Sequence, residues 1–123
     1  MPAAEIRLGR LAPCIPTSDI ARAVTFYERV FGMTKTFDNG EPVGFVVMKR
    51  DDAELHLTLV KDHVGKTNNV MHMIVDGADE LYRRCEAAAG ARIIKKLRDA
   101  PWGMRTFVVA DPDGNRIDVG QPL

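Results

Sequence analysis

Cysteine is scarce in this chain. Cys14 and Cys85 are the only two among 123 residues, and they lie far apart, so neither a zinc-finger motif nor a redox Cys-x-x-Cys motif is present. Isolated cysteines are typical of proteins that stay reduced, which favours a cytoplasmic location. Cys85 falls on the apolar side of a predicted helix, where a thiol packs as a small hydrophobic group.

An excess of charge of either sign is also missing. The 17 Lys and Arg residues balance 17 Asp and Glu residues, so no strong overall field would draw the chain to nucleic acid or to an anionic membrane. No apolar stretch has the length of a membrane span, and the segment MPAAEIRLGR has no apolar signal-peptide region. We therefore expect one cytoplasmic domain over residues 1–123, with no nucleic-acid or membrane partner and with enough apolar residues (46%) for a core.

The motifs of several common catalytic classes are absent. The chain contains no nucleophile elbow and no Cys/His pair at a recognisable spacing. Its glycines stand at predicted caps and turns rather than in a phosphate-binding loop. In the segment DPDGN, Asp111 and Asp113 flank a proline and precede a glycine, and the formation of a hairpin turn explains these residues.

The sequence does contain an internal repeat. The segment TSDIARAVTFYERVFG has apolar residues at helical spacing, a capping residue among positions 17–19 and a left-handed stop at Gly32. The segment DGADELYRRCEAAAG repeats this plan, with acidic residues in its first turn and Gly90 at its end. The predicted apolar faces are Ile20, Ala23, Val24, Tyr27, Val30 and Phe31 in the first helix and Ala78, Leu81, Tyr82, Cys85 and Ala88 in the second.

Strand-like segments surround each predicted helix. A short apolar strand comes before it (LAPCIP and VMHMIV), and three strands follow it: TKTF, VGFVVM and ELHLTLV in the first half, and RIIKKL, RTFVVA and RIDVG in the second. Both halves therefore predict a βαβββ module, over about residues 8–62 and 69–121. A module of about 55 residues buries its sheet face poorly alone, so we expect an α+β fold in which two modules pair around a pocket.

Three blocks of the sequence resemble a known family. They are SDIARAVTFYERVFGM, VDGADELYRRCEAAAG and DPDGNRID, and they follow one another along almost the whole chain. In this order they resemble the glyoxalase / bleomycin resistance / extradiol dioxygenase superfamily, the vicinal oxygen chelate proteins, and most closely its bleomycin resistance proteins. The resemblance implies paired βαβββ modules that form a curled mixed sheet around a cleft. It implies less about function, because this fold hosts lyases, isomerases, dioxygenases and binding proteins.

Enzymes of the superfamily hold a divalent metal in the cleft, with ligands from the first and last strand of each module. Matching the motifs places these four positions at Ala12, His56, Val70 and Asp118. Ala12 and Val70 have no donor atom, whereas a catalytic metal site usually needs three protein ligands. His72 would complete a set with His56 and Asp118, but a shift of two residues moves a side chain ~6–7 Å along a strand. We therefore expect no cofactor, unless a bulge near Val70 brings His72 into place for a divalent metal.

The same matching gives the candidate ligand-binding residues. Trp102 in APWGMR is either a core or interface anchor or a stacking wall for a flat heteroaromatic ligand, since the PWG segment borders the groove in the resemblance. Strand alternation in RIDVG puts Asp118 on the same face as Arg116, where it would pair with Arg116 or meet a ligand cation. The expected binding residues are Trp102, His56, His72, Asp118 and Arg116.

Pro13 lies within the first predicted strand. Because proline cannot donate a ladder hydrogen bond, it marks a sheet edge or a point where the chain leaves the sheet. The bleomycin resistance proteins exchange their N-terminal strand between subunits near such a proline, and APCIP resembles that pattern. The resemblance thus implies a strand-swapped homodimer with a cleft at each subunit interface.

Two functions stay open on this basis. The missing donors at Ala12 and Val70 favour a binding protein that sequesters a flat, partly cationic small molecule of the bleomycin type without turnover. Neutral net charge and a single tryptophan count against bleomycin itself, because electrostatic steering of a cation would be weak. The alternative is a metal-dependent glyoxalase-like lyase or isomerase, or a dioxygenase, in which a metal polarises vicinal oxygens.

Overall fold

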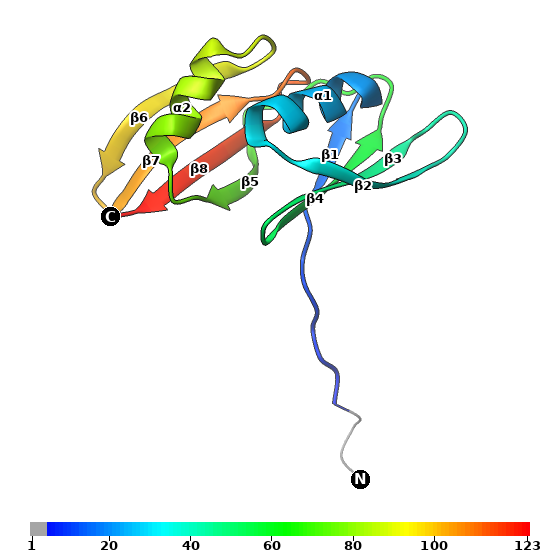
Figure 1. Cartoon of the computed structure of the whole chain (residues 1–123), viewed down its shortest axis with the longest axis horizontal. Helices are drawn as coiled ribbons and strands as arrows, with labels where there is room; N and C mark the ends of the chain where they lie inside the picture. The colour runs from blue at the N-terminus through cyan, green and yellow to red at the C-terminus, as the bar shows by residue number, and fades with distance from the viewer. Residues whose placement is uncertain (1–4) are drawn as a thin grey trace.

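A computed structural model describes residues 5–123, within which the chain forms two helices and eight strands (Figure 1). Neither helix is long and apolar enough to cross a membrane. In chain order the elements are β1 (Cys14–Thr17), α1 (Ile20–Phe31), β2 (Thr34–Asn39), β3 (Phe45–Arg50), β4 (Ala53–Leu59), β5 (Asn69–Ile74), α2 (Ala78–Ala87), β6 (Arg92–Ala100), β7 (Met104–Ala110) and β8 (Arg116–Pro122).

The strands form two four-stranded sheets with the same topology. The strand orders are β1-β4-β3-β2 and β5-β8-β7-β6. In each sheet the first strand pairs in parallel with the last, and the other pairs are antiparallel. Figure 1 shows the two sheets beside each other with both helices on one side. The α+β fold of two βαβββ modules is therefore confirmed, with one mixed sheet in each half of the chain.

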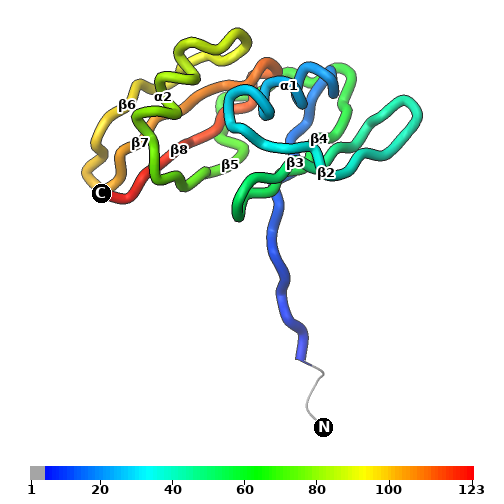
Figure 2. Tube along the Cα trace, in the orientation of Figure 1, coloured from blue at the N-terminus to red at the C-terminus, as the bar shows by residue number. Residues whose placement is uncertain are grey.

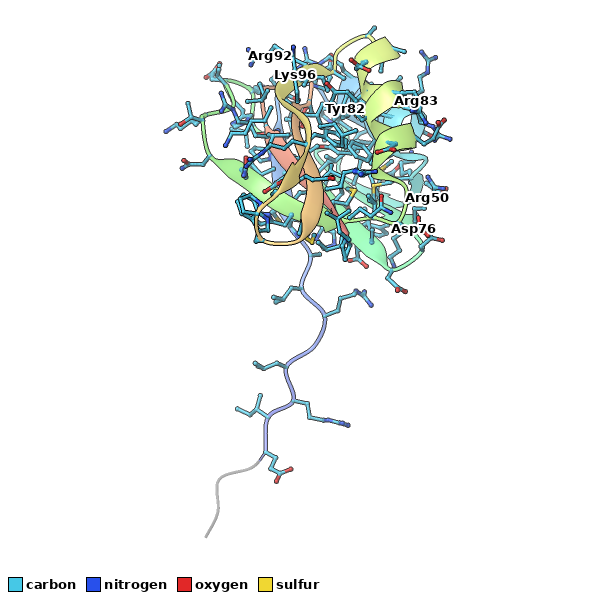
Figure 3. All side chains as sticks on the ribbon, turned by 90° about the vertical axis from the view of Figure 1, so that its left-hand side faces the viewer. Arg50, Asp76, Tyr82, Arg83, Arg92 and Lys96 are labelled. Atoms are coloured by element: carbon cyan, nitrogen blue, oxygen red, sulfur yellow. The ribbon has the colours of Figure 1, made fainter. Side chains whose placement is uncertain are left out.

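The helices follow the sequence pattern closely. Asp19 caps α1 by accepting a hydrogen bond from the Arg22 amide at 3.0 Å, and Gly32 ends the helix with φ 67°. Helix α2 packs on its sheet through Tyr82, whose ring centroid lies 5.1 Å from that of Phe107 (Figure 3). This helix stops before the predicted Gly90, because Ala88 is already extended; Gly90 takes its positive φ in the turn that leads to β6.

Strand alternation gives each sheet one closed face and one open face. In the first sheet Ile15, Leu55 and Leu57 are buried on the side of α1. In the second sheet Ile117 and Val119 are buried in the same way. Residues at the alternate positions, which include His56 and Asp118, therefore point away from the helices.

The DPDGN turn joins the second module to the first. Asp113 accepts hydrogen bonds from the Ser18 amide at 2.9 Å and the Ser18 hydroxyl at 2.8 Å, and it forms an ion pair with Arg22 at 2.6 Å. Burial raises the pKa of Asp113, but the hydrogen bonds from Thr17 and Ser18 and the charge of Arg22 outweigh this effect and hold it below its usual value. We call this group of contacts the module clasp.

A second carboxylate, Asp111, completes the module clasp. It accepts hydrogen bonds from the Tyr27 hydroxyl at 2.8 Å and from the Asn115 side chain at 3.0 Å. Burial raises the pKa of Asp111, and the hydrogen bonds from Asn115 and Tyr27 offset only part of that rise. His63, in the connector between the modules, contacts the Asn115 side-chain oxygen at 2.8 Å. The turn therefore has a structural role, as predicted, and also fixes the two modules together.

Residues 5–13 form an extended arm outside both sheets (Figures 1 and 2). Strand β1 begins at Cys14, so Ala12 and Pro13 precede it rather than lie within it. Three aliphatic side chains of the arm are almost fully exposed: Ile6 (85%), Leu8 (93%) and Leu11 (91%). Exposure of three large aliphatic side chains within six residues is unusual for a protein that works as a monomer.

Candidate functional site

A pocket of about 260 Å³ lies on the open face of the second sheet. Strands β5, β7 and β8 form its floor, and the turn between β6 and β7 forms one wall. We call it the β5–β8 pocket; its lining residues are His72, Ile74, Trp102, Met104, Thr106, Asp118 and Gly120.

His72 and Asp118 form a polar pair on the floor of this pocket. They are direct partners in the parallel β5–β8 ladder, and His72 Nδ1 lies 3.1 Å from Asp118 Oδ2. Thr106 Oγ1 donates to Asp118 Oδ1 at 3.3 Å. The expectation that His72 lies too far along the strand is wrong, because the ladder shifts register between Asn69 and Met71 and so aligns His72 with Asp118.

Trp102 stands at the rim of the pocket. Its side chain is 67% exposed, so it is not a core anchor within this chain. The Arg98 guanidinium carbon lies 5.3 Å from the ring centroid, a cation–π distance. Much of the indole surface nevertheless faces solvent beside His72 and Asp118. An exposed indole next to a carboxylate can stack on a flat ligand and attract a cationic group.

Arg116 takes no part in this arrangement. It lies on the same strand face as Asp118, as predicted, but it does not line the pocket, and no Arg116–Asp118 ion pair occurs within residues 5–123. His72 and Thr106 hold the carboxylate instead. Of the two expected partners of Asp118, Arg116 or a ligand cation, Arg116 is therefore wrong.

His56 belongs to the other sheet. It lies on β4, where its Nε2 is 2.7 Å from Glu54 Oε2 and its ring meets the Phe45 ring edge-on at 5.3 Å. Glu54 also pairs with Arg10 at 2.8 Å and with Lys49 at 3.4 Å. The hydrogen bond from His56, together with these two cations, lowers the pKa of Glu54, so this carboxyl group stays ionised.

A wider groove of about 680 Å³ runs between the modules on the helix side. Its floor includes Phe31, Met73 and Leu81, and charged side chains surround it. Arg50 and Asp76 belong to this rim, and Figure 3 shows them at the same edge of the molecule. Arg50 is already engaged with the Phe31 carbonyl oxygen at 2.8 Å. Neither a nucleophile–base pair nor a buried polar group marks this groove as a reaction site.

Comparisons with known proteins agree with this fold. Residues 7–119 match the model of the Glyoxalase/Bleomycin resistance protein/Dioxygenase superfamily. The chain belongs to this superfamily. Among its relatives, an uncharacterised protein of Mycobacterium bovis is 30% identical over 92% of this chain and 83% of its own length. A bleomycin resistance protein of Geobacillus stearothermophilus is 25% identical over 90% of this chain and 95% of its own length.

Solved structures share this fold at low identity. A bleomycin-binding protein in complex with bleomycin covers 94% of this chain and 100% of its own, with a TM-score of 0.76 and 22% identity. TioX from Micromonospora sp. ML1 covers 94% of this chain and 99% of its own, with a TM-score of 0.75 and 24% identity. At these identities the likeness concerns the fold.

The metal-ligand positions of the superfamily do not form a metal site within this chain. His72 and Asp118 supply two donors at the β5–β8 pocket, while His56 is bound to Glu54 on the first sheet. No group of three or more His, Cys, Asp or Glu side chains suited to a metal ion exists in the described part of the chain. A catalytic metal needs about three protein ligands, so the donors of one chain do not fit such an ion.

Sequence reasoning did not include Cys14 among the candidate residues on the open sheet faces. It is the direct ladder partner of His56, just as His72 is the partner of Asp118. Each sheet thus has a pair of side chains from its first and last strand as direct partners in the parallel ladder, Cys14 with His56 and His72 with Asp118. The internal repeat could have indicated this position. The spacing from Cys14 to His72 equals that from Ala12 to Val70, so Cys14 is the equivalent of His72 in the first module.

Proposed function

We propose that this protein binds a flat, partly cationic small molecule at the β5–β8 pocket and releases it unchanged. The observation that carries the proposal is the Asp118 carboxylate on the pocket floor beside the exposed Trp102 indole. The carboxylate offers a charge-assisted hydrogen bond to a cation, and the indole offers a stacking surface. The bleomycin resistance relatives support a binding role, whereas the neutral charge of this chain argues for a ligand other than bleomycin.

We further propose that a second copy of the chain completes the site. A volume of about 260 Å³ is below the ~300–1,000 Å³ of most ligand pockets, so a further wall would be needed to enclose a drug-sized molecule. The exposed arm would reach the partner, in a strand exchange near Pro13. The open face of one chain's first sheet, with His56, would then face the β5–β8 pocket of the other.

The proposed binding function requires no cofactor. We also propose that the protein is cytoplasmic. The alternative, a metal-dependent glyoxalase-like lyase or isomerase or a dioxygenase, gains from the register shift that pairs His72 with Asp118. It still needs a third donor, which in a dimer would be the partner's His56. Elemental analysis after loading with Ni, Mn, Zn or Fe(II) separates the two: one retained equivalent per chain, lost in H72A and D118A, would replace the binding function with the metal enzyme.

Calorimetric titration with a flat cation tests the binding function directly. We expect 9-aminoacridine, a cation at neutral pH, to bind more tightly than the uncharged acridine. Substitution of Asp118→Asn removes the charge from the pocket floor and should raise Kd for the cation by about tenfold, with little effect on acridine. Asp62→Asn removes an exposed charge in the connector and serves as the matched control. Equal affinity of both dyes, or equal effects of the two substitutions, would contradict the proposal.

A further inference from the structure

Basic side chains gather on the open face of the second sheet. Three of them come from β6 and pair with alternate residues of β7: Arg92 with Ala110, Lys95 with Val108 and Arg98 with Thr106. Phe107, which lies between these β7 residues, packs against Tyr82 of α2, so its neighbours face the other way. Directly paired residues share a face of the sheet, and the three exposed β6 cations therefore lie on the open face.

Two bulges in β6 produce this arrangement. The ladder shifts register between Ile93 and Lys95 and again between Lys95 and Arg98. In a regular strand Lys95 would point to the face opposite that of Arg92, because the two residues are three apart. Each bulge adds one residue to β6 and returns the next cation to the open face. The cations of β6 therefore follow one another at intervals of ~7 Å, the rise of two strand residues.

Arg116 of β8 extends this group into the sheet. Arg116 and Arg92 are both ladder partners of Ala110, so the two arginines flank one small side chain in a row across three strands. Their backbones are ~10 Å apart, and two long guanidinium side chains can converge on one anion over that span. Cations on an edge strand can serve only to prevent edge-to-edge pairing, but β8 lies inside the sheet. We call Arg92, Lys95, Arg98 and Arg116 the cationic strip.

The cationic strip has no counter-charge of its own. None of its four side chains forms an ion pair within residues 5–123. Arg105, on the helix side of the same sheet, differs in this respect, since it has Asp99 at 2.8 Å and Asp79 at 3.4 Å. Like charges gathered on one face without carboxylate partners attract an anionic group from outside the chain.

The cationic strip borders the β5–β8 pocket. The Arg98 guanidinium carbon lies 5.3 Å from the ring centroid of Trp102, which lines the pocket. Thr106, the ladder partner of Arg98, is also a lining residue. Asp118 on the pocket floor comes two residues after Arg116 on the same face of β8. A molecule stacked on the indole therefore has the strip directly beside it.

We propose that the ligand of the β5–β8 pocket carries a carboxylate or phosphate group and that the cationic strip binds this group. Guanidinium groups bind such oxyanions through paired hydrogen bonds, and the lysine adds a point charge. The inference rests on the proposed binding of a flat molecule at this pocket and adds a negative group to that molecule. The ligand is then zwitterionic, with its cation at Asp118 and its oxyanion between Arg92 and Arg116.

Two matched pairs of flat dyes test the proposal, with quenching of the single tryptophan, Trp102, as the readout at constant ionic strength. Riboflavin 5′-phosphate differs from riboflavin by a phosphate group, and 9-aminoacridine-4-carboxylate differs from 9-aminoacridine by a carboxylate. We expect the anionic member of at least one pair to bind about tenfold more tightly than its parent. The pair that shows this difference identifies the oxyanion as phosphate or carboxylate.

Variants of the cationic strip show whether it causes the difference. The double variant Arg92→Gln with Arg116→Gln should remove the advantage of the anionic dye and leave the affinity for its parent within about twofold. Arg92→Gln and Lys95→Gln change exposed side chains of the edge strand, so they preserve the test if the variant at the half-buried Arg116 fails to fold. Arg29→Gln removes an exposed cation from α1, on the other side of the sheets, and serves as the matched control.

The outcomes separate this inference from the proposed binding function. Equal affinities within both pairs, or an advantage that survives in folded strip variants, would overturn the role of the strip while cation binding at Asp118 stands. If 9-aminoacridine does not bind but riboflavin 5′-phosphate binds more tightly than riboflavin, the strip stands and the cation site fails. Absence of binding by all four dyes would overturn both.

Discussion

At the scale of single residues, surroundings decide what each carboxylate near the C-terminus does. Asp111 and Asp113 are buried between the modules and bound to groups of the first module. Asp118, only seven and five residues further along, is partly exposed on a pocket floor beside His72. The first two therefore stabilise the fold, and the third is available to a ligand.

Substitution of Asp113→Asn tests the structural role. The amide leaves Arg22 without its partner and cannot accept all the hydrogen bonds from Thr17 and Ser18. Loss of a buried, charge-assisted network of this kind should reduce the free energy of unfolding by about 2 kcal/mol. Midpoints of urea unfolding measure the change, and Asp62→Asn should leave the midpoint almost unchanged.

The same residue predicts a dependence of stability on pH. The folded pKa of Asp113 is below its ordinary value, so its contribution is present above the unfolded pKa of ~3.9 and is lost as pH falls through the folded value. Asp111, whose folded pKa is raised, acts in the opposite sense: its contribution is lost as pH rises through that value. The wild type should therefore lose stability more steeply than Asp113→Asn below about pH 4. Equal slopes in urea unfolding at pH 3 to 5 would contradict this role.

The residue types of this region were predictable, but their partners were not. The DPDGN segment predicts a turn from local backbone preferences alone. Thr17, Ser18 and Tyr27 lie 84 to 96 residues away along the chain, and nothing local in the sequence reports such distant contacts. In the same way His72 and Asp118 could be chosen as candidates, whereas the register shift that joins them depends on how two distant strands pair.

At the scale of elements, periodicity was sufficient to locate both helices and most strands, although α2 ends before the predicted Gly90. Asp19 and Gly32 mark the ends of α1 in the sequence and in the structure. The arm is the exception, since LAPCIP predicts a strand from its apolar residues, yet β1 starts only at Cys14. Pro13 still accepts a hydrogen bond from the His56 amide of β4 at 2.9 Å, but the ladder register starts at Cys14, and apolar composition alone does not extend it to residues 5–12.

The connector between the modules offers an element-scale prediction. Gly65 donates its amide to the Asp113 carbonyl at 2.7 Å, and a Cβ atom at this position would lie 2.1 Å from the backbone carbon of Gly114. Backbone on both sides cannot yield as a side chain can, so Gly65→Ala should cost at least about 2 kcal/mol of unfolding free energy. Thermal and urea unfolding both measure this effect.

Gly77, at the start of α2, is the matched control for that substitution. Nothing lies within 4 Å of a Cβ atom placed there, and its φ of −138° suits any residue. Because Gly77 is the N-cap of α2, where alanine is less favourable than glycine, Gly77→Ala should cost no more than about 1 kcal/mol, well below Gly65→Ala. If both alanine variants are equally stable, the close approach of the connector to the DPDGN turn does not exist in solution.

At the scale of the whole molecule, the chain has two open sheet faces with polar side chains and an arm that extends beyond both sheets. One open face carries Cys14 and His56, and the other carries His72 and Asp118. Within one chain these faces belong to separate sheets, each backed by a helix (Figure 1). A twofold assembly would bring one face of each kind together twice, because an isologous dimer repeats every contact.

The oligomeric state in solution tests this arrangement. Light scattering after size-exclusion chromatography should give twice the chain mass of 13.6 kDa. Replacing Ile6 and Leu8 by Asp removes the apolar groups that would contact the partner and adds charge, so this variant should dissociate at least tenfold more readily. Leu123→Asp, at an exposed position outside the arm, should remain dimeric. A monomeric wild type would leave the arm unexplained, and it would require the β5–β8 pocket to bind its ligand without a second wall.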